Sequence, residues 1–407
     1  MNRVFVTGYG LITAFGRTWA ENKEAFARGE NAVRHMGEYV KYKDLDTHLA
    51  APILDYTPPR EWDRKQLRSL GRVSQYSVEA AGAALDMSGL DRELIKDGRM
   101  GVAAGSSSGS TDAILSMAKM YMGEDNRDSG INANTYIKMM PHTIAANISL
   151  FYGLKGRLIP TSSACASASQ AIGYAYESIK NGKIPLMLAG GGEELCVSQT
   201  FTFNFLYATS TKNDTPKLTP SPFDMNRDGL VVGEGAAFLV LESEKSMKAR
   251  QAMPIAEVVG YGSTCDGTHI TRPQSATMKE AMILALEDAK IEKEKISYIN
   301  AHATATKWGD IAESIATNEL FGSDVKISSL KSYLGHTLGA CGGIESIACI
   351  EMLREGVFYP TINLKDIDPA CAKLGYLREI ESIKGDFSMN NNFAFGGVNT
   401  SLIFKRV

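Results

Sequence analysis

Cys165 is the residue of this chain with the clearest potential for covalent chemistry. It lies in the segment SSACASASQAIGYAYESIKNGKI, residues 162–184, immediately before a long run with helical periodicity. A thiol at a helix N-terminus faces unpaired N–H groups and the positive end of the helix dipole, and both stabilise the nucleophilic thiolate. Cysteine is also a small hydrophobic residue that packs well where a helix approaches other backbone. The segment alone leaves both interpretations open.

Two histidines follow strand-like runs elsewhere in the chain. His302 comes after SYIN in the segment NAHATATKWGD, and His336 lies in SYLGHTLGACGG, shortly after Lys331. In open α/β sheets, functional sites gather at the carboxyl ends of strands, so we expect the thiol and both imidazoles to meet there. A thiolate can hold an acyl group, and two imidazole N–H groups can stabilise the enolate that forms when a malonyl thioester loses CO₂. The wide spacing of the histidines, without a pattern of carboxylate ligands, argues against a metal site.

The composition is typical of a globular protein, and its net charge does not indicate a basic surface that binds nucleic acid. The chain has 407 residues, 44% of them hydrophobic and 22% charged, and a net charge of −3. This balance excludes a strongly basic nucleic-acid-binding protein but permits a local basic patch for an acidic carrier. The sequence shows no signal peptide and no apolar run long enough to span a membrane. Its six cysteines form no CxxC pair, which predicts no disulfide framework, no zinc site and a cytoplasmic location.

Short β-branched runs alternate with helical patterns, which predicts an α/β fold. The pattern also occurs twice. Residues 79–108 and 280–306 both read as helix, acidic loop, strand and small-residue loop, and residues 159–183 and 327–357 both read as strand, polar loop and small-residue helix. Internal repetition indicates two similar halves, which we place at 1–250 and 251–407. The extra length of the first half, at 17–78 and 109–140, is predicted to form insertions that cap a site.

These motifs resemble those of the β-ketoacyl-acyl-carrier-protein synthases, condensing enzymes of the thiolase superfamily with a Cys–His–His triad. The resemblance covers the whole chain and includes RVFVTGYG, SSACASASQAIG, PFDMNRDGLVVGEGA, NAHATATKWGD, KSYLGHTLGACGGIES and NNNFAFGGVNTSLIF, in this order. It implies a thiolase-like fold in which two duplicated α/β halves form a layered α-β-α-β-α body. It also implies a decarboxylative Claisen condensation that extends an acyl chain by two carbons.

The resemblance assigns roles to particular residues of the chain. Cys165 matches the nucleophile, and His302 and His336 match the histidines that bind the malonyl thioester and promote decarboxylation. Lys331 matches the lysine that supports the second histidine, and Glu313 matches a buried acid that orders the site. The other assignments are Phe395 as a gating aromatic whose N–H joins that of Cys165 in the oxyanion hole, Thr304 and Thr306 as contacts of the phosphopantetheine arm, and Phe203 and Ser108 in the acyl pocket.

Partners and cofactors follow from the same resemblance. The acyl and malonyl groups are expected to arrive on the phosphopantetheine arm of an acyl carrier protein, so no redox, organic or metal cofactor is predicted. The chain is expected to form a homodimer, or a heterodimer with a related ketosynthase-like subunit that lacks the cysteine.

The chain departs from the family pattern beside His302. Alanine at 303 replaces a glycine, and Lys307 and Trp308 stand where proline and a small residue are usual. Trp308 is placed beside the pantetheine tunnel, where an indole narrows the passage or contacts the arm. The stretches MMPHTIAANISLFYGLKGRLIPTSSAC and DGTHITRP resemble synthases of specialised polyene pathways, such as those that make aryl polyene pigments.

Three other functions remain as alternatives. A thiolase has a loop similar to the one around His336, but it uses a second catalytic cysteine where this chain has His302. A serine hydrolase is suggested only by the short pattern Gly105–Ser106–Ser107–Ser108–Gly109. A chain-length-determining or otherwise inactive partner subunit keeps the fold but loses the nucleophile, which this chain retains.

Overall fold

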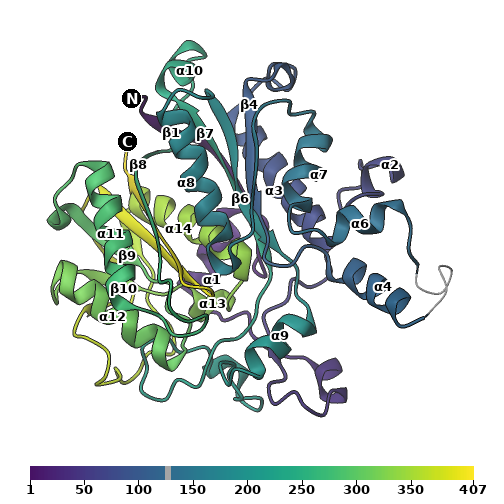
Figure 1. The fold of residues 1–407 in the computed structure, drawn as a ribbon. Helices are drawn as coiled ribbons and strands as arrows, with labels where there is room; N and C mark the ends of the chain where they lie inside the picture. Colours follow the sequence, from purple (N-terminus) through teal and green to yellow (C-terminus); the bar gives the residue numbers. More distant parts are fainter. Residues whose placement is uncertain (124–129) are drawn as a thin grey trace.

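The computed structural model describes residues 1–123 and 130–407. Within them the main sheet has eleven strands in the order β12-β10-β9-β14-β15-β8-β1-β7-β6-β4-β5 (Figure 1). Its strands are β1 (Val4–Ile12), β4 (Met100–Gly105), β5 (Leu158–Thr161), β6 (Leu186–Glu193), β7 (Gly235–Ser243), β8 (Ala256–Cys265), β9 (Ile296–Asn300), β10 (Lys326–Ser328), β12 (Gly375–Tyr376), β14 (Phe387–Ala394) and β15 (Val398–Lys405). Two small antiparallel sheets of two strands pair β2 (Arg34–His35) with β3 (Leu49–Ala50) and β11 (Val357–Phe358) with β13 (Glu381–Ser382).

The strand order repeats itself, as the internal repeat in the sequence predicts. The order β5-β4-β6-β7-β1 in one half corresponds to β10-β9-β14-β15-β8 in the other. In each half four strands run in one direction, and one strand, β7 in the first half and β15 in the second, runs antiparallel to them. The halves join where β1 pairs antiparallel with β8, from Val4 opposite Val258 to Val6 opposite Ala256. The fold is therefore α/β with a duplicated arrangement of strands.

Helices cover both outer faces of the sheet and fill the space between its halves (Figure 1). The helices are α1 (Trp19–Ala27), α2 (Arg64–Leu67), α3 (Arg72–Ser88), α4 (Thr111–Tyr121), α6 (Ala133–Met139), α7 (Thr143–Tyr152), α8 (Ser167–Lys180), α9 (Val197–Asn204), α10 (Glu244–Ala249), α11 (Ser275–Ala289), α12 (Lys307–Phe321), α13 (Lys331–Leu334) and α14 (Cys341–Glu355). Helices α3 and α7 pack on the first half of the sheet and α11 on the second, where it also contacts α12, whereas α8 and α14 contact strands of both halves. Helices outside each half of the sheet and helices between the halves together give the expected α-β-α-β-α layers.

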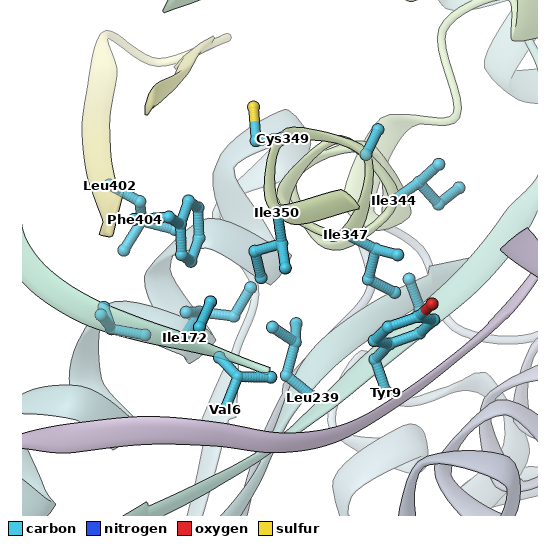
Figure 2. Close-up of a cluster of buried hydrophobic side chains, with 14 of the residues drawn as sticks. Val6, Tyr9, Ile172, Leu239, Ile344, Ile347, Cys349, Ile350, Leu402 and Phe404 are labelled. Carbon is cyan, nitrogen blue, oxygen red and sulfur yellow. The ribbon is translucent and has the colours of Figure 1, made fainter. Parts of the chain in front are cut away.

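The core of the molecule surrounds the central helix α14. All side chains from Cys341 to Leu353 are buried, as expected for a helix that is enclosed on every side. Figure 2 shows Ile347 and Ile350 of this helix directed towards Val6 and Leu239 on neighbouring strands. Each such aliphatic side chain contributes about 1.5–3 kcal/mol by leaving water. The strands beneath read as continuous apolar runs because both of their faces are covered.

The two central helices begin in the same way, and their starts meet. A short 3₁₀ turn precedes each helix, η3 (Ala164–Ala166) before α8 and η6 (Leu338–Ala340) before α14. The first residue of each turn has a left-handed backbone, with φ of 48° at Ala164 and 46° at Leu338. Gly342 allows the close approach, because a Cβ there would lie 2.0 Å from the Ser169 hydroxyl oxygen. The fold thus brings the start of α14 against the turn that carries the cysteine.

The two segments predicted to cap a site lie in the longer first half of the chain. The 109–140 segment forms α4 and α6, which pack against each other, and residues 124–129 lie outside the described residues. Neither 17–78 nor the described part of 109–140 contributes to the cleft that contains Cys165. That these segments cover a site stays a prediction. No described helix is both long and apolar enough to cross a membrane.

Candidate active site

The three residues singled out from the sequence converge at one point. Cys165, His302 and His336 are buried, and their reactive atoms all lie within 4.8 Å of one another. The Nε2 atom of His336 is 2.9 Å from the sulfur of Cys165, which is hydrogen-bonding distance. The two imidazole rings are 5.2 Å apart and nearly perpendicular, at 84°. A thiol and two imidazoles therefore face one small volume.

Local hydrogen bonds fix the turn that carries the thiol. The Ser167 hydroxyl donates to the carbonyl of Ala164 at 2.7 Å and accepts from the N–H of Ser163 at 3.1 Å. The thiol of Cys341 donates to the carbonyl of Cys165 at 3.3 Å. The left-handed φ of Ala164 is unfavourable for an L-residue by about 1–2 kcal/mol. Strained turns of this kind persist at functional sites, where the surrounding contacts over-determine them.

Two buried carboxylates on α12 hold the loop that carries His302. Glu313 accepts hydrogen bonds from the backbone N–H groups of His302 and Ala303, at 2.8 and 2.7 Å. Asp310, one turn earlier, accepts from the next two N–H groups of the loop and from that of Phe223, the last at 2.8 Å. Burial raises the pKa of Asp310 to about 6 and that of Glu313 to about 8, while these N–H groups favour the ionised forms.

Glu313 therefore positions the loop through its backbone, in agreement with the ordering role that the resemblance implies. The sequence analysis did not identify Asp310, although its spacing of three residues from Glu313 places both acids on one face of the helix.

Lys331 provides a buried positive charge beside the three reactive groups. Its ammonium forms an ion pair with Glu345, and the second oxygen of Glu345 accepts a hydrogen bond from Asn392 at 2.7 Å. Burial and the charge of Lys331 hold the pKa of both imidazoles well below the usual value of 6.5. Both histidines are therefore uncharged at neutral pH. The effect extends to His302 as well as to the second histidine, which Lys331 was predicted to support.

The thiol of Cys165 is protonated at rest. Burial raises its pKa to about 12, whereas Lys331 and the backbone N–H groups of Phe395 and Cys165 itself lower it. The local stabilisation of thiolate expected from the helix start is thus present, but the cost of burying a charge outweighs it. Activation of the sulfur requires an acceptor for its proton, and the imidazole of His336 is in contact with it.

The three reactive residues lie in a cleft of about 1040 Å³ that also contains Thr304, Thr306, Phe203 and Phe395. The two threonine hydroxyls are 3.0 Å apart, and the two phenylalanine rings meet edge to face at 5.2 Å. The backbone after Phe395 turns through two glycines with positive φ, and the N–H of Gly396 donates to the carbonyl of Ile270.

Ser108 lies outside the cleft that the structure defines. Its hydroxyl accepts a hydrogen bond from Gln199 at 3.2 Å, on the helix that also carries Phe203. The neighbouring Ser107 donates to the buried carboxylate of Glu193 at 2.6 Å. This serine-rich turn is thus tied to an acid, and among the described residues its hydroxyls have no histidine partner, contrary to what a serine hydrolase requires.

Two imidazoles and a thiol are also a donor set that zinc can use. The buried ammonium of Lys331 lowers the pKa of both histidines, and the same field disfavours a second cation between them. The donor set consequently suits proton transfer and anion stabilisation better than metal binding.

Comparison with known proteins identifies the family. Residues 1–246 match the family model described as Beta-ketoacyl synthase, N-terminal domain, and residues 255–365 match Beta-ketoacyl synthase, C-terminal domain. The chain is 33% identical to 3-oxoacyl-[acyl-carrier-protein] synthase 1 of Haemophilus influenzae, over 100% of this chain and 99% of that protein.

Solved structures agree with this assignment. The chain is similar to the crystal structure of a beta-ketoacyl synthase from Burkholderia phymatum, with 55% identity, complete coverage of both chains and a TM-score of 0.98. It is also similar to a chain of the AntDE:AntF complex, described as a type II PKS acyl-carrier protein with its ketosynthase bound to the hexaketide. That match has 28% identity, a TM-score of 0.89 and coverage of 100% of this chain and 99% of the other. The chain, with its converging thiol and imidazoles, belongs to the β-ketoacyl synthase family.

Proposed function

We propose that the chain catalyses decarboxylative condensation of malonyl-acyl carrier protein with an acyl group held on Cys165. The observation that carries this proposal is the contact of a buried thiol with one of two uncharged imidazoles at the end of one cleft. The relatives named above are 3-oxoacyl-[acyl-carrier-protein] synthases and ketosynthases, which supports the reaction class.

In the first half-reaction the sulfur of Cys165 attacks the carbonyl carbon of an acyl thioester. Its proton moves to Nε2 of His336 and from there to the departing thiolate of the pantetheine arm. The backbone N–H groups of Cys165 and Phe395, which face the sulfur, stabilise the oxyanion of the tetrahedral intermediate. The products are acyl-Cys165 and a carrier with a free thiol.

In the second half-reaction the malonyl thioester carbonyl lies against His302 and His336. The bond to the carboxylate breaks, CO₂ leaves, and the electron pair moves into an enolate whose oxygen accepts hydrogen bonds from both imidazole N–H groups. The enolate carbon attacks acyl-Cys165, and the thiolate of Cys165 leaves and regains a proton. The two threonines contact the arm in both half-reactions, and no cofactor is needed beyond the arm that the carrier supplies.

The partner and the pathway are part of the same proposal. Strand β5 lies at one edge of the sheet, and α4 exposes large apolar side chains, including Tyr121 at 80%. Unpaired edges and exposed apolar surface favour a second subunit, either another copy or a related ketosynthase-like chain. The departures around Trp308 and the polyene-like stretches noted above support a role in a specialised polyene pathway of the aryl polyene type.

The test compares acylation with condensation in variants of the triad. Intact-protein mass spectra of the wild type should show an acyl adduct after mixing with acyl carrier, and a two-carbon-longer carrier product after malonyl carrier is added. His302→Ala should keep the adduct and lose CO₂ release, whereas His336→Ala should slow both steps because His336 contacts the sulfur. His269→Ala is the matched control, since this exposed histidine of the cleft mouth has no assigned role in the chemistry. Adduct formation in Cys165→Ala would refute the proposal.

A further inference from the structure

A buried carboxylate that the chemistry described above does not use lies behind the site. Glu193 is the last residue of β6, and its side chain is fully buried. Burial raises its pKa, and the strongest effects that favour its charged form come from hydrogen-bond donors. Because a buried carboxylate is costly unless donors compensate it, the segments that supply those donors indicate what the acid holds in place.

The two oxygens of Glu193 join three segments that are distant in the sequence. Oε1 accepts a hydrogen bond from the hydroxyl of Ser106 at 2.8 Å and from Nε2 of Gln199 at 3.3 Å. Oε2 accepts from the backbone N–H of Ser107 at 2.8 Å and from that of Gly339 at 3.1 Å. One carboxylate therefore ties together the loop after β4, helix α9 and the turn η6 before α14.

The turn η6 is strained where the carboxylate holds it. Its first residue, Leu338, has the left-handed φ noted above, and its side chain belongs to the same apolar cluster as Cys165. The N–H that Glu193 accepts is that of the next residue, Gly339. A Cβ at Gly339 would lie 2.8 Å from Oε2 of Glu193, so the turn packs directly on the carboxylate. The acid thus supplies one of the contacts that keep a strained turn in place.

The strained turn connects the acid to the reactive groups. Gly339 is the second residue of η6, as Cys165 is of η3, and the two turns are in contact. His336 lies just before η6, and its Nε2 is 2.9 Å from the sulfur of Cys165. Any displacement of η6 relative to η3 therefore changes the distance between the imidazole and the thiol.

We propose that Glu193 is a positioning residue, which holds η6 so that the imidazole of His336 stays in contact with the sulfur of Cys165. This inference rests on the proposed function, because that contact matters when the thiol is acylated. Glu193 acts through the backbone N–H of Gly339 and not on the reacting atoms. The site then has one buried acid for each histidine, since Glu313 holds the loop of His302 in the same way.

The test is the pH dependence of Cys165 acylation, because few groups near the sulfur change charge between about pH 7 and 9. The pKa values of both imidazoles lie well below 6.5, that of Lys331 is raised above 10.5 and that of Cys341 lies well above 9. Glu313, with a pKa of about 8, bonds to the loop of His302 and not to η6. The wild-type rate should therefore change less than about threefold in this range, with His336 as the base.

Glu193→Ala should lose this base. Acylation by an acyl carrier, followed by intact-protein mass spectrometry, should be about 10²-fold slower at about pH 7, the scale of general base catalysis. The remaining reaction depends on thiolate formed in solution. Since the pKa of Cys165 is about 12, the thiolate fraction rises about tenfold per pH unit. The deficit should consequently shrink to less than about tenfold at about pH 9.

Three further variants separate positioning from folding. Glu193→Gln keeps an acceptor oxygen for Gly339 and should restore most of the rate lost in Glu193→Ala. Gly339→Ala disturbs the same contact from the other side and should give the same steep pH profile, so the test does not depend on one variant. Glu194→Ala is the matched control, because this neighbouring buried acid accepts the N–H groups of Val73 and Thr111 instead. Its pH profile should stay flat.

The outcomes distinguish this inference from the proposed function. A flat profile in Glu193→Ala and Gly339→Ala, including a rate lowered equally at every pH, would overturn the positioning role. A steep profile in Glu194→Ala would overturn it as well, because it would follow from the loss of any buried acid on this strand. A wild type that no acyl carrier acylates would instead overturn the proposed function itself.

Discussion

Replacement of Glu313 by glutamine tests how the loop of His302 is held. The two carboxylate oxygens accept backbone N–H groups at 2.8 and 2.7 Å, and glutamine keeps the shape but supplies only one acceptor oxygen. Above its pKa of about 8 Glu313 is ionised, and at such a pH a hydrogen bond to the charged group contributes about 1.5–3 kcal/mol, while a buried N–H left without an acceptor costs a similar amount. We therefore expect the loop to lose about 2–4 kcal/mol of its preference for the observed conformation. The loop must recover that conformation to act, so the rate falls by about 30- to 10³-fold.

This loss should appear in one half-reaction only. His302 acts in decarboxylation, so CO₂ release from malonyl carrier should fall by about 10²-fold, whereas acylation of Cys165 should change less than about threefold. The assay follows CO₂ release and the acyl adduct in the same preparation. Glu319→Gln is the matched control, because Glu319 lies on the same helix but pairs at the surface with Lys279. Normal CO₂ release in Glu313→Gln would refute the reasoning, as would an equal loss in both half-reactions.

Three further predictions concern the buried charges and the thiol. Lys331→Met should lower the free energy of unfolding by about 3–5 kcal/mol, because it leaves Glu345 buried and unpaired. The double variant Lys331→Met/Glu345→Gln should recover most of this loss in urea titrations. A double variant no more stable than the single one would contradict the pairing. Because both imidazole pKa values lie well below 6.5, the histidines stay uncharged and should add no acid limb to CO₂ release between about pH 6.5 and 8, where Glu313, with a pKa of about 8, titrates. A limb in this range that persists in Glu313→Gln would contradict this prediction. Since burial raises the pKa of Cys165 to about 12, iodoacetamide at about pH 8 should label the exposed Cys265 before Cys165. Peptide mass mapping follows the order of labelling. Faster labelling of Cys165 would contradict the prediction, because it would show an activated thiolate.

The duplicated fold could be predicted from the sequence because each half repeats the same order of polar and apolar runs. The repeat of small-residue helix starts at 159–183 and 327–357 corresponds to the turns before α8 and α14, which share even the left-handed first residue. The long segments of the first half could not be placed in this way. Their sequence shows that helices are present but not which face of the body they cover, since that depends on packing between distant residues.

The triad was predictable because each reactive residue follows the end of a strand, where sites of α/β folds gather. The strands before Cys165 and His302 lie far apart in the sheet order, and the contact between the turns before α8 and α14 brings the two halves of the site together. The protonation states of the triad could not be predicted, because the depth of burial of a side chain has no local signature in the sequence. Position at a helix start suggested a thiolate at Cys165, but full burial gives a neutral thiol. The same holds for two buried contacts. Lys331 pairs with Glu345, and Asp310 accepts N–H groups from both the His302 loop and Phe223, and these segments meet only in the folded chain.

The most direct test of the account is the mass of the intact protein after mixing with a panel of acyl carriers, followed by the mass of the carriers after malonyl carrier is added. Saturated, unsaturated and aryl-polyenoyl chains belong in the panel. The account predicts one acyl adduct on Cys165, absent in Cys165→Ala, and then a β-ketoacyl carrier two carbons longer. No adduct with any member of the panel, or an adduct that persists in Cys165→Ala, would contradict it.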